Sequence, residues 1–84
     1  MIVKVRSIIM HVYDQPVYSF EDCEVIGKRT VCNQDMYFVK KLKPDILHTY
    51  YNASIQDCIV VSGHDDVIPL LTREQVHNML FPTV

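Results

Sequence analysis

Short runs of β-branched and aromatic residues, separated by turn-forming residues, occupy the first half of this chain of 84 residues. In residues 2–6, hydrophobic residues alternate with a lysine and an arginine, and this period of two is typical of a half-buried strand. The run Ile-Ile-Met at 8–10 breaks the alternation, which predicts a β-bulge or burial on both faces. An antiparallel meander follows, with strands predicted at 2–13, 17–26, 29–32 and 36–42 and turns at 14–16 and 33–35.

A tight hairpin is predicted within residues 23–32, with Gly27 and Lys28 at the centre of its turn. Glycine suits the first central position of a type II′ turn, because it takes positive φ there without strain. Pairing outward from this turn places Cys23 opposite Cys32, at a separation that permits a disulfide.

The cellular compartment decides whether that disulfide is expected. Lys4 and Arg6 interrupt the apolar run near the start, so no secretion signal is visible. No stretch approaches the roughly 18 apolar residues of a membrane span. Three cysteines are an odd number for a disulfide framework. We therefore expect a cytoplasmic chain with reduced cysteines, and place Cys23 and Cys32 in the core.

The second half of the chain gives weaker signals. Residues 44–51 favour a short helix that begins at Pro44, with a strand as the alternative. Residues 58–61, Cys-Ile-Val-Val, are an apolar run that predicts a central strand buried on both faces. Pro69 restricts any strand at 67–71 to an edge of the sheet.

The C-terminus has the clearest local signal. Thr72 and Gln75 have the spacing of a helix capping box, and Pro82 ends the helix. The predicted apolar stripe consists of Val76, Met79 and Leu80. We predict one domain over residues 1–84, an α+β fold in which a small antiparallel β-meander sheet is packed by this helix. The alternative is a partly closed SH3-like barrel.

Two constellations have the residue types of a chemical site, but neither has the expected context. Cys58 with His64 could act as nucleophile and base, yet Cys58 begins an apolar strand, where a cysteine is usually inert. Zinc could be held by Cys23, Cys32, Cys58 and His64, but the close cysteine pair of most structural sites is missing. With only two glycines, phosphate-binding loops are excluded. We expect no enzyme, no catalytic residues, no metal and no cofactor.

A basic stretch with nearby aromatic side chains is the candidate interaction surface. It consists of Lys40, Lys41, Lys43, Tyr50 and Tyr51. Lysines that follow phosphates and tyrosines that stack on bases are typical of single-strand binding, so a nucleic-acid-binding module is the alternative function. The net charge of −2 opposes it.

What remains is association with protein. The chain has 49% hydrophobic residues and a length at which a single core is marginal. We predict a small non-enzymatic protein-binding module that occupies a partner's surface, that does not engage a membrane, and that forms a homodimer through apolar side chains on an exposed strand or the helix. Virus-encoded inhibitors of host proteins are one class of such chains.

Overall fold

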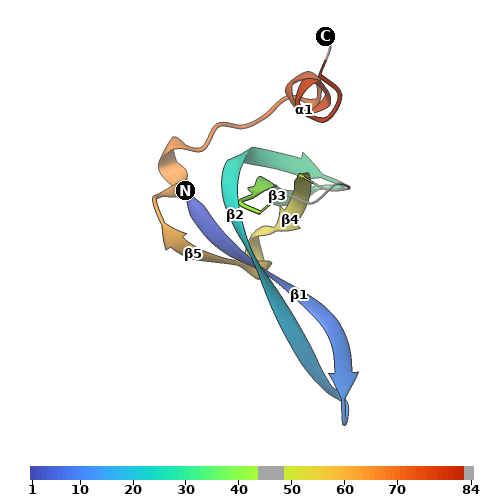
Figure 1. The fold of residues 1–84 in the computed structure, drawn as a ribbon. Helices are drawn as coiled ribbons and strands as arrows, with labels where there is room; N and C mark the ends of the chain where they lie inside the picture. Colours follow the sequence, from blue (N-terminus) through green and yellow to red (C-terminus); the bar gives the residue numbers. More distant parts are fainter. Residues whose placement is uncertain (44–48, 83–84) are drawn as a thin grey trace.

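The fold is a five-stranded antiparallel sheet with one C-terminal helix (Figure 1). The computed structural model describes residues 1–43 and 49–82. The strand order is β4-β3-β2-β1-β5, which confirms the α+β meander with its helix. The elements are β1 (Ile2–Val12), β2 (Gln15–Val31), β3 (Gln34–Lys41), β4 (Tyr50–Ser54), the 3₁₀ turn η1 (Ile55–Asp57), β5 (Cys58–Ser62), the 3₁₀ turn η2 (Asp65–Val67) and α1 (Arg73–Leu80).

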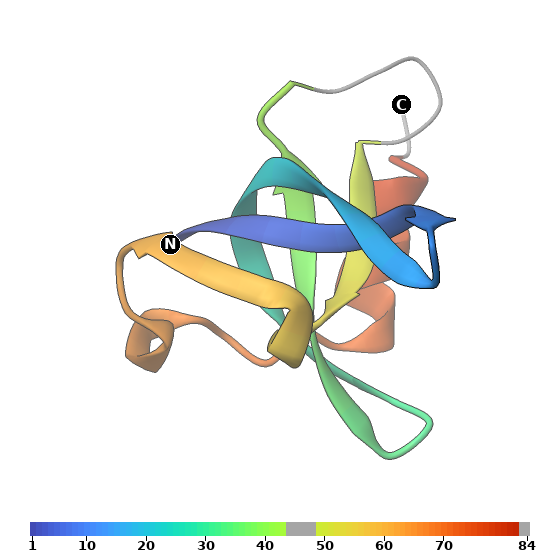
Figure 2. The same cartoon turned by 90° about the horizontal axis from the view of Figure 1, so that it is seen from below.

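The sheet curves but does not close into a barrel (Figure 2). Its two edge strands, β4 and β5, are linked in sequence by η1. Within the described residues no ladder joins β4 to β5. The open sheet, rather than the barrel alternative, is therefore the form that this chain takes.

Two tight turns connect the first three strands. Val12 pairs with Gln15, so Tyr13 and Asp14 form a two-residue turn in which both have positive φ, 49° and 61°. A second turn of the same form joins β2 to β3. Positive φ at both central residues is the geometry of a type I′ hairpin. Turns are thus confirmed close to the predicted positions 14–16 and 33–35.

Gly27 lies inside β2, and the predicted hairpin turn at Gly27-Lys28 is wrong. The strand continues without interruption past this position, and Gly27 pairs with Phe38 of β3 beside a β-bulge. A methyl group at Gly27 would overlap the side chain of Leu71. The glycine therefore makes room for a neighbouring segment, and no reversal of the chain depends on it.

Cys23 and Cys32 are consequently not cross-strand partners, contrary to prediction. Cys23 pairs with Val3 on one side and Lys41 on the other, and it is fully buried. Cys32 is exposed in the β2–β3 turn, where its φ is 51°. The core position is confirmed for Cys23 and wrong for Cys32. Cys23, Cys32 and Cys58 are all free thiols.

The main core lies on one face of the sheet, called here the core face. Cross-strand partners such as Val3 and Cys23, or Val25 and Val39, share a face because side chains alternate along each strand. The buried cluster consists of Val3, Val5, Cys23, Val25, Tyr37, Val39 and Ala53. Phe38 is buried on the opposite, outer face, where Leu71 lies against Gly27. The segment that leads into α1 therefore covers part of the outer face.

Two predictions for the second half of the chain need correction. β5 is an edge strand, and Ile59, Val60 and Val61 are each more than half exposed, so burial on both faces is wrong. A single apolar run cannot show its place in the strand order. Part of the helix predicted at 44–51 lies outside the described residues, but its end is strand, since Tyr50 begins β4. After η2, one isolated bridge joins Leu70 to β2.

The C-terminal helix forms as predicted, but with a narrower buried face. The N–H of Gln75 donates to Thr72 Oγ1 at 3.1 Å, and the N–H of Thr72 donates to Gln75 Oε1 at 2.8 Å. This confirms the capping box. Val76 is buried, whereas Leu80 is 44% exposed, so the predicted burial of Leu80 is wrong. A helix of eight residues has little more than two turns, and its last residue does not reach the core.

Candidate functional site

The most unusual feature of the molecule is a two-stranded arm, residues 7–20, formed by the distal halves of β1 and β2 (Figure 1). β5 pairs with β1 only as far as Val5. β3 pairs with β2 only from Cys23 onward. Beyond these points the hairpin extends away from the sheet, and within the described residues neither of its edges is joined by another strand.

Large apolar side chains on the arm are exposed. Their exposed fractions range from 39% to 96%. The arm has a single formal charge, that of Asp14 in its turn. The exposed apolar residues are Ile8, Ile9, Met10, Val12, Tyr13, Tyr18 and Phe20. An isolated two-stranded hairpin is marginally stable in water, and exposed apolar side chains gathered on one segment make the arm a candidate interaction surface.

The arm is apolar on both faces. Ile8 pairs with Tyr18, whereas Met10 pairs with Val17, so Ile9 is the extra residue of a β-bulge. Of the two alternatives predicted at 8–10, the bulge is thus confirmed, and Ile8, Ile9 and Met10 are exposed. By alternation, Ile8, Tyr18 and Phe20 share the outer face, and Met10 and Val17 share the core face.

A cation–π contact holds the outer face of the arm against its base. The guanidinium carbon of Arg6 is 4.8 Å from the centre of the Tyr18 ring. The same guanidinium pairs with Asp57 of η1 at 3.1 Å. Arg6 therefore links the first part of the arm to the turn between the two edge strands.

The predicted basic surface is formed in part. Lys40 pairs with Tyr50, and its Nζ is 5.9 Å from the centre of that ring. Lys41 has the same separation from the Tyr51 ring. Because side chains alternate along strands, these two lysine–tyrosine pairs lie on opposite faces of the sheet. Lys43 follows β3 and is exposed.

Carboxylates lie among these lysines. Lys41 Nζ is 3.6 Å from Glu21 Oε1. Lys4 pairs with Asp22 at 2.9 Å and, with a smaller contribution from Lys43, holds the pKa of that carboxyl below its ordinary value. The surface is therefore of mixed charge.

A hollow of about 400 Å³ opens on the core face at the base of the arm. It is lined by Ser7, Ser19, Glu21, Lys41 and Tyr51. The Tyr51 hydroxyl is 3.4 Å from Cys23 Sγ. Burial raises the pKa of Tyr51, and also that of Cys23. Both groups are therefore protonated at neutral pH, and the hollow presents hydroxyls together with one ion pair.

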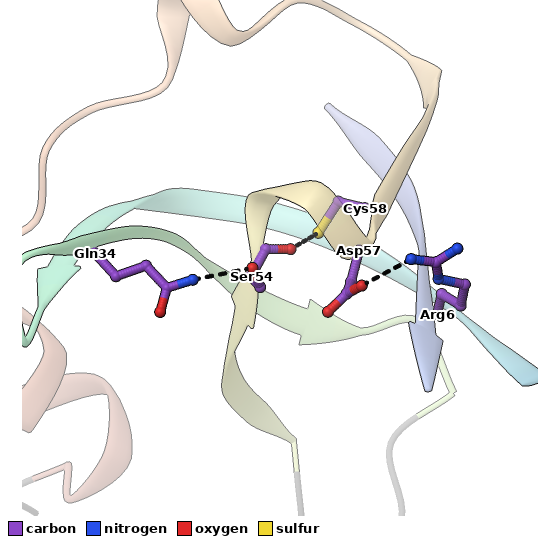
Figure 3. A network of polar contacts seen from close by, with 5 residues as sticks. All are labelled: Arg6, Gln34, Ser54, Asp57 and Cys58. Carbon is purple, nitrogen blue, oxygen red and sulfur yellow. Dashed lines mark hydrogen bonds and ion pairs between the residues drawn. The ribbon is translucent and has the colours of Figure 1, made fainter. Parts of the chain in front are cut away.

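Cys58 belongs to a structural network around η1 (Figure 3). Its thiol donates to the carbonyl oxygen of Ser54 at 3.4 Å, and Gln34 Nε2 donates to Ser54 Oγ at 3.3 Å. Burial raises the pKa of Cys58 to about 11. A protonated thiol that is hydrogen-bonded to the backbone is a poor nucleophile. The hydrogen bonds of Cys58 and Gln34 to Ser54 instead hold the turn between β4 and β5.

Over residues 1–43 and 49–82, no group of three or more His, Cys, Asp or Glu side chains could hold a metal ion. In the same part of the chain, no helix has the length and apolar character needed to cross a membrane.

Comparison of the chain with protein-family models, with curated proteins and with solved structures finds no match.

Sequence reasoning missed the arm as a candidate interaction surface. Its signal was present, because residues 7–20 combine eight large apolar residues with one formal charge. Such a run is equally compatible with a buried strand pair. The distinction depends on where β3 and β5 end, which local pattern does not encode.

Proposed function

We propose that the chain is a small non-enzymatic protein-binding module that acts by occupying a partner protein's surface, with the arm as its contact. The observation that carries this proposal is the exposure of apolar side chains on both faces of the arm. Exposure of these side chains to water is unfavourable, and burying them in an apolar groove on a partner lowers the free energy.

The shape and charge of the arm support a groove as the complementary surface. A two-stranded ribbon that enters a groove buries both of its faces, and each fully buried large apolar side chain contributes about 1.5–3 kcal/mol. The mixed charges at its base, including Arg6, Glu21 and Lys41, would lie at the rim of such a contact. Rim charges orient partners more than they add affinity.

The groove-filling geometry proposed for the arm supports a competitive mode of action. A module that fills a partner's groove excludes whatever else binds there, which is how a competitive inhibitor acts. That the chain is a virus-encoded inhibitor of a host protein stays a prediction, and it is consistent with this mode of action. A cytoplasmic location also stays a prediction.

We also propose self-association, through the edge strand β5. Ile59, Val60 and Val61 are exposed there, and the strand has no charged residue or proline to oppose pairing. Sedimentation equilibrium over a micromolar range should give masses that rise above the 9.8 kDa monomer. Val60→Lys should abolish the rise, and Val67→Lys, at an exposed position outside β5, should not.

The protein-binding function is tested with matched surface variants. Ile8→Ser with Phe20→Ser removes an aliphatic and an aromatic side chain from the arm. Val67→Ser with Phe81→Ser removes the same types from exposed positions elsewhere. Proteins captured from cell extract by the wild type should be lost with the arm variant and retained with the control. Equal capture by the two variants would reject the arm as the contact, provided that both have the wild-type circular dichroism spectrum.

A further inference from the structure

The open edge of β2 in the arm has backbone groups arranged to accept another strand. The N–H of Leu42 donates to the carbonyl oxygen of Asp22 at 3.0 Å, which shows that Asp22 directs its backbone toward the β3 side. Backbone groups alternate between the two edges of a strand. Phe20 and Tyr18 therefore direct their N–H and C=O groups to the same edge, where no strand in the described residues pairs with them.

Pro16 agrees with this assignment. Pro16 lies an even number of residues from Asp22, so its nitrogen faces the same, open edge of β2. The missing N–H of proline therefore removes no hydrogen bond from the β1–β2 ladder. The backbone groups of Ser19 face the other edge of β2, where Ser19 pairs with Ser7 of β1. Among the residues that the structure describes, the edge from Tyr18 to Phe20 is thus unpaired, and it is regular because the bulge of the arm lies in β1.

The hollow at the base of the arm lies beside the same open edge. Ser19 and Glu21 contribute to its wall from β2, and Lys41 contributes from the last residue of β3. In the β2–β3 ladder Cys23 pairs with Lys41, and a further strand in this direction would set side chains opposite Glu21 and Ser19. Those side chains would enter the hollow.

We infer that this edge binds an extended segment of a partner protein, which adds to the sheet as a strand beside β2. The inference rests on the proposed protein-binding function and specifies its mode. Residues of the added strand opposite Tyr18 and Phe20 would contact the apolar outer face, and their neighbours would enter the hollow. Because Glu21 and Lys41 are already paired with each other, the hollow favours an uncharged side chain that can both donate and accept hydrogen bonds.

The strand of a second copy does not fit this edge as well. A register that pairs both Tyr18 and Phe20 with the strand of a second copy, Tyr18 opposite Phe20, would set that copy's Pro16 opposite Asp22. Leu42 already occupies this position. The tip of the second arm would then overlap the end of β3. A single extended strand can end before this point, and it is therefore the occupant that the geometry accommodates.

The experiment uses the full chain and a display library of random octapeptides. Peptides enriched by the wild type should alternate apolar residues with uncharged polar residues. Their binding should slow hydrogen exchange most at the amides of Tyr18 and Phe20, which face the open edge, and less at the amide of Ser19, which already faces β1. Enrichment of no peptide, or binding without this alternating protection, would overturn the inference.

A pair of variants separates the backbone from the side chain. Phe20→Ala removes the ring and keeps the N–H, whereas Phe20→Pro removes both. Loss of one hydrogen bond should weaken an enriched peptide roughly 10-fold further in the proline variant. Equal affinity of the two variants would contradict strand addition. If capture of partners depends on the arm but Tyr18 and Phe20 gain no protection, the protein-binding function stands and the strand mode fails.

Discussion

The two halves of the β1–β2 ladder differ sharply although the same two strands form both. In the proximal half, Val3 and Val5 face Cys23 and Glu21, and both valines are buried. In the distal half, every β1 residue from Ser7 to Val12 is exposed. The proximal half is flanked by β3 and β5, and the distal half is not. Flanking strands, rather than hydrophobic content, therefore decide which part of a ladder becomes core.

Matched valine substitutions in β1 should give the largest difference between the halves. Val3 is 0% exposed and Val12 is 44% exposed. Val3→Ala leaves a cavity and should lower the free energy of unfolding by about 2–3 kcal/mol. Val12→Ala should change it by less than about 0.5 kcal/mol, as for most surface substitutions. Urea denaturation measures both, and equal losses would show that the distal half contributes to the core.

Gly27→Ala should be the next largest effect, a loss of about 1–3 kcal/mol, because overpacking displaces Leu71. The double variant with Leu71→Ala should lose less than the sum of the two single variants, since the space is then available. Additive losses of unfolding free energy in the same urea experiment would show that positions 27 and 71 do not interact.

Cys32→Gly should increase stability, by about 0.4–1 kcal/mol, because Cys32 has positive φ in an exposed turn. Cys23→Ser should instead destabilise by about 1–3 kcal/mol, because its hydroxyl would replace a buried thiol. Thermal unfolding compares the two. A loss of stability with Cys32→Gly would favour the core position predicted from the sequence.

The smallest effect concerns Lys4 and Asp22, in the proximal half of the ladder. Because the folded-state pKa of Asp22 lies below its ordinary value of 3.8, the pair stabilises the fold above that pH. The contribution is lost as pH falls through the folded-state value. Lys4→Gln should raise the pKa of Asp22 in an NMR titration of the carboxyl carbon. An unchanged pKa would show that the ion pair does not persist in solution.

The strands and turns of the first half could be predicted because their signals are local. Alternation in β1 and the polar residues near 14 and 33 are properties of a few adjacent positions. The capping box of Thr72 and Gln75 is local in the same way. Gly27 shows the limit: glycine marks both a tight turn and a close approach by another segment, and the second cause, Leu71, is 44 positions away.

Strand order and strand ends could not be predicted, and the candidate site depends on both. The apolar run of β5 is compatible with a central strand, yet β5 lies at an edge because, over residues 1–43 and 49–82, it pairs with β1 alone. The arm is exposed because β3 and β5 end early. The basic stretch at 40–43 was visible, but its pairing with Glu21, 20 positions from Lys41, was not.

Hydrogen exchange of the free protein tests the central claim, that the arm is a locally unstable extension of a stable body. Amides of β1 and β2 in the proximal half should exchange only through global unfolding. Ladder amides of the arm should exchange on the order of 100-fold faster or more, through local opening of an unflanked hairpin. Arm amides as slow as those of the proximal half, in protein shown to be monomeric at the concentration used, would contradict the account.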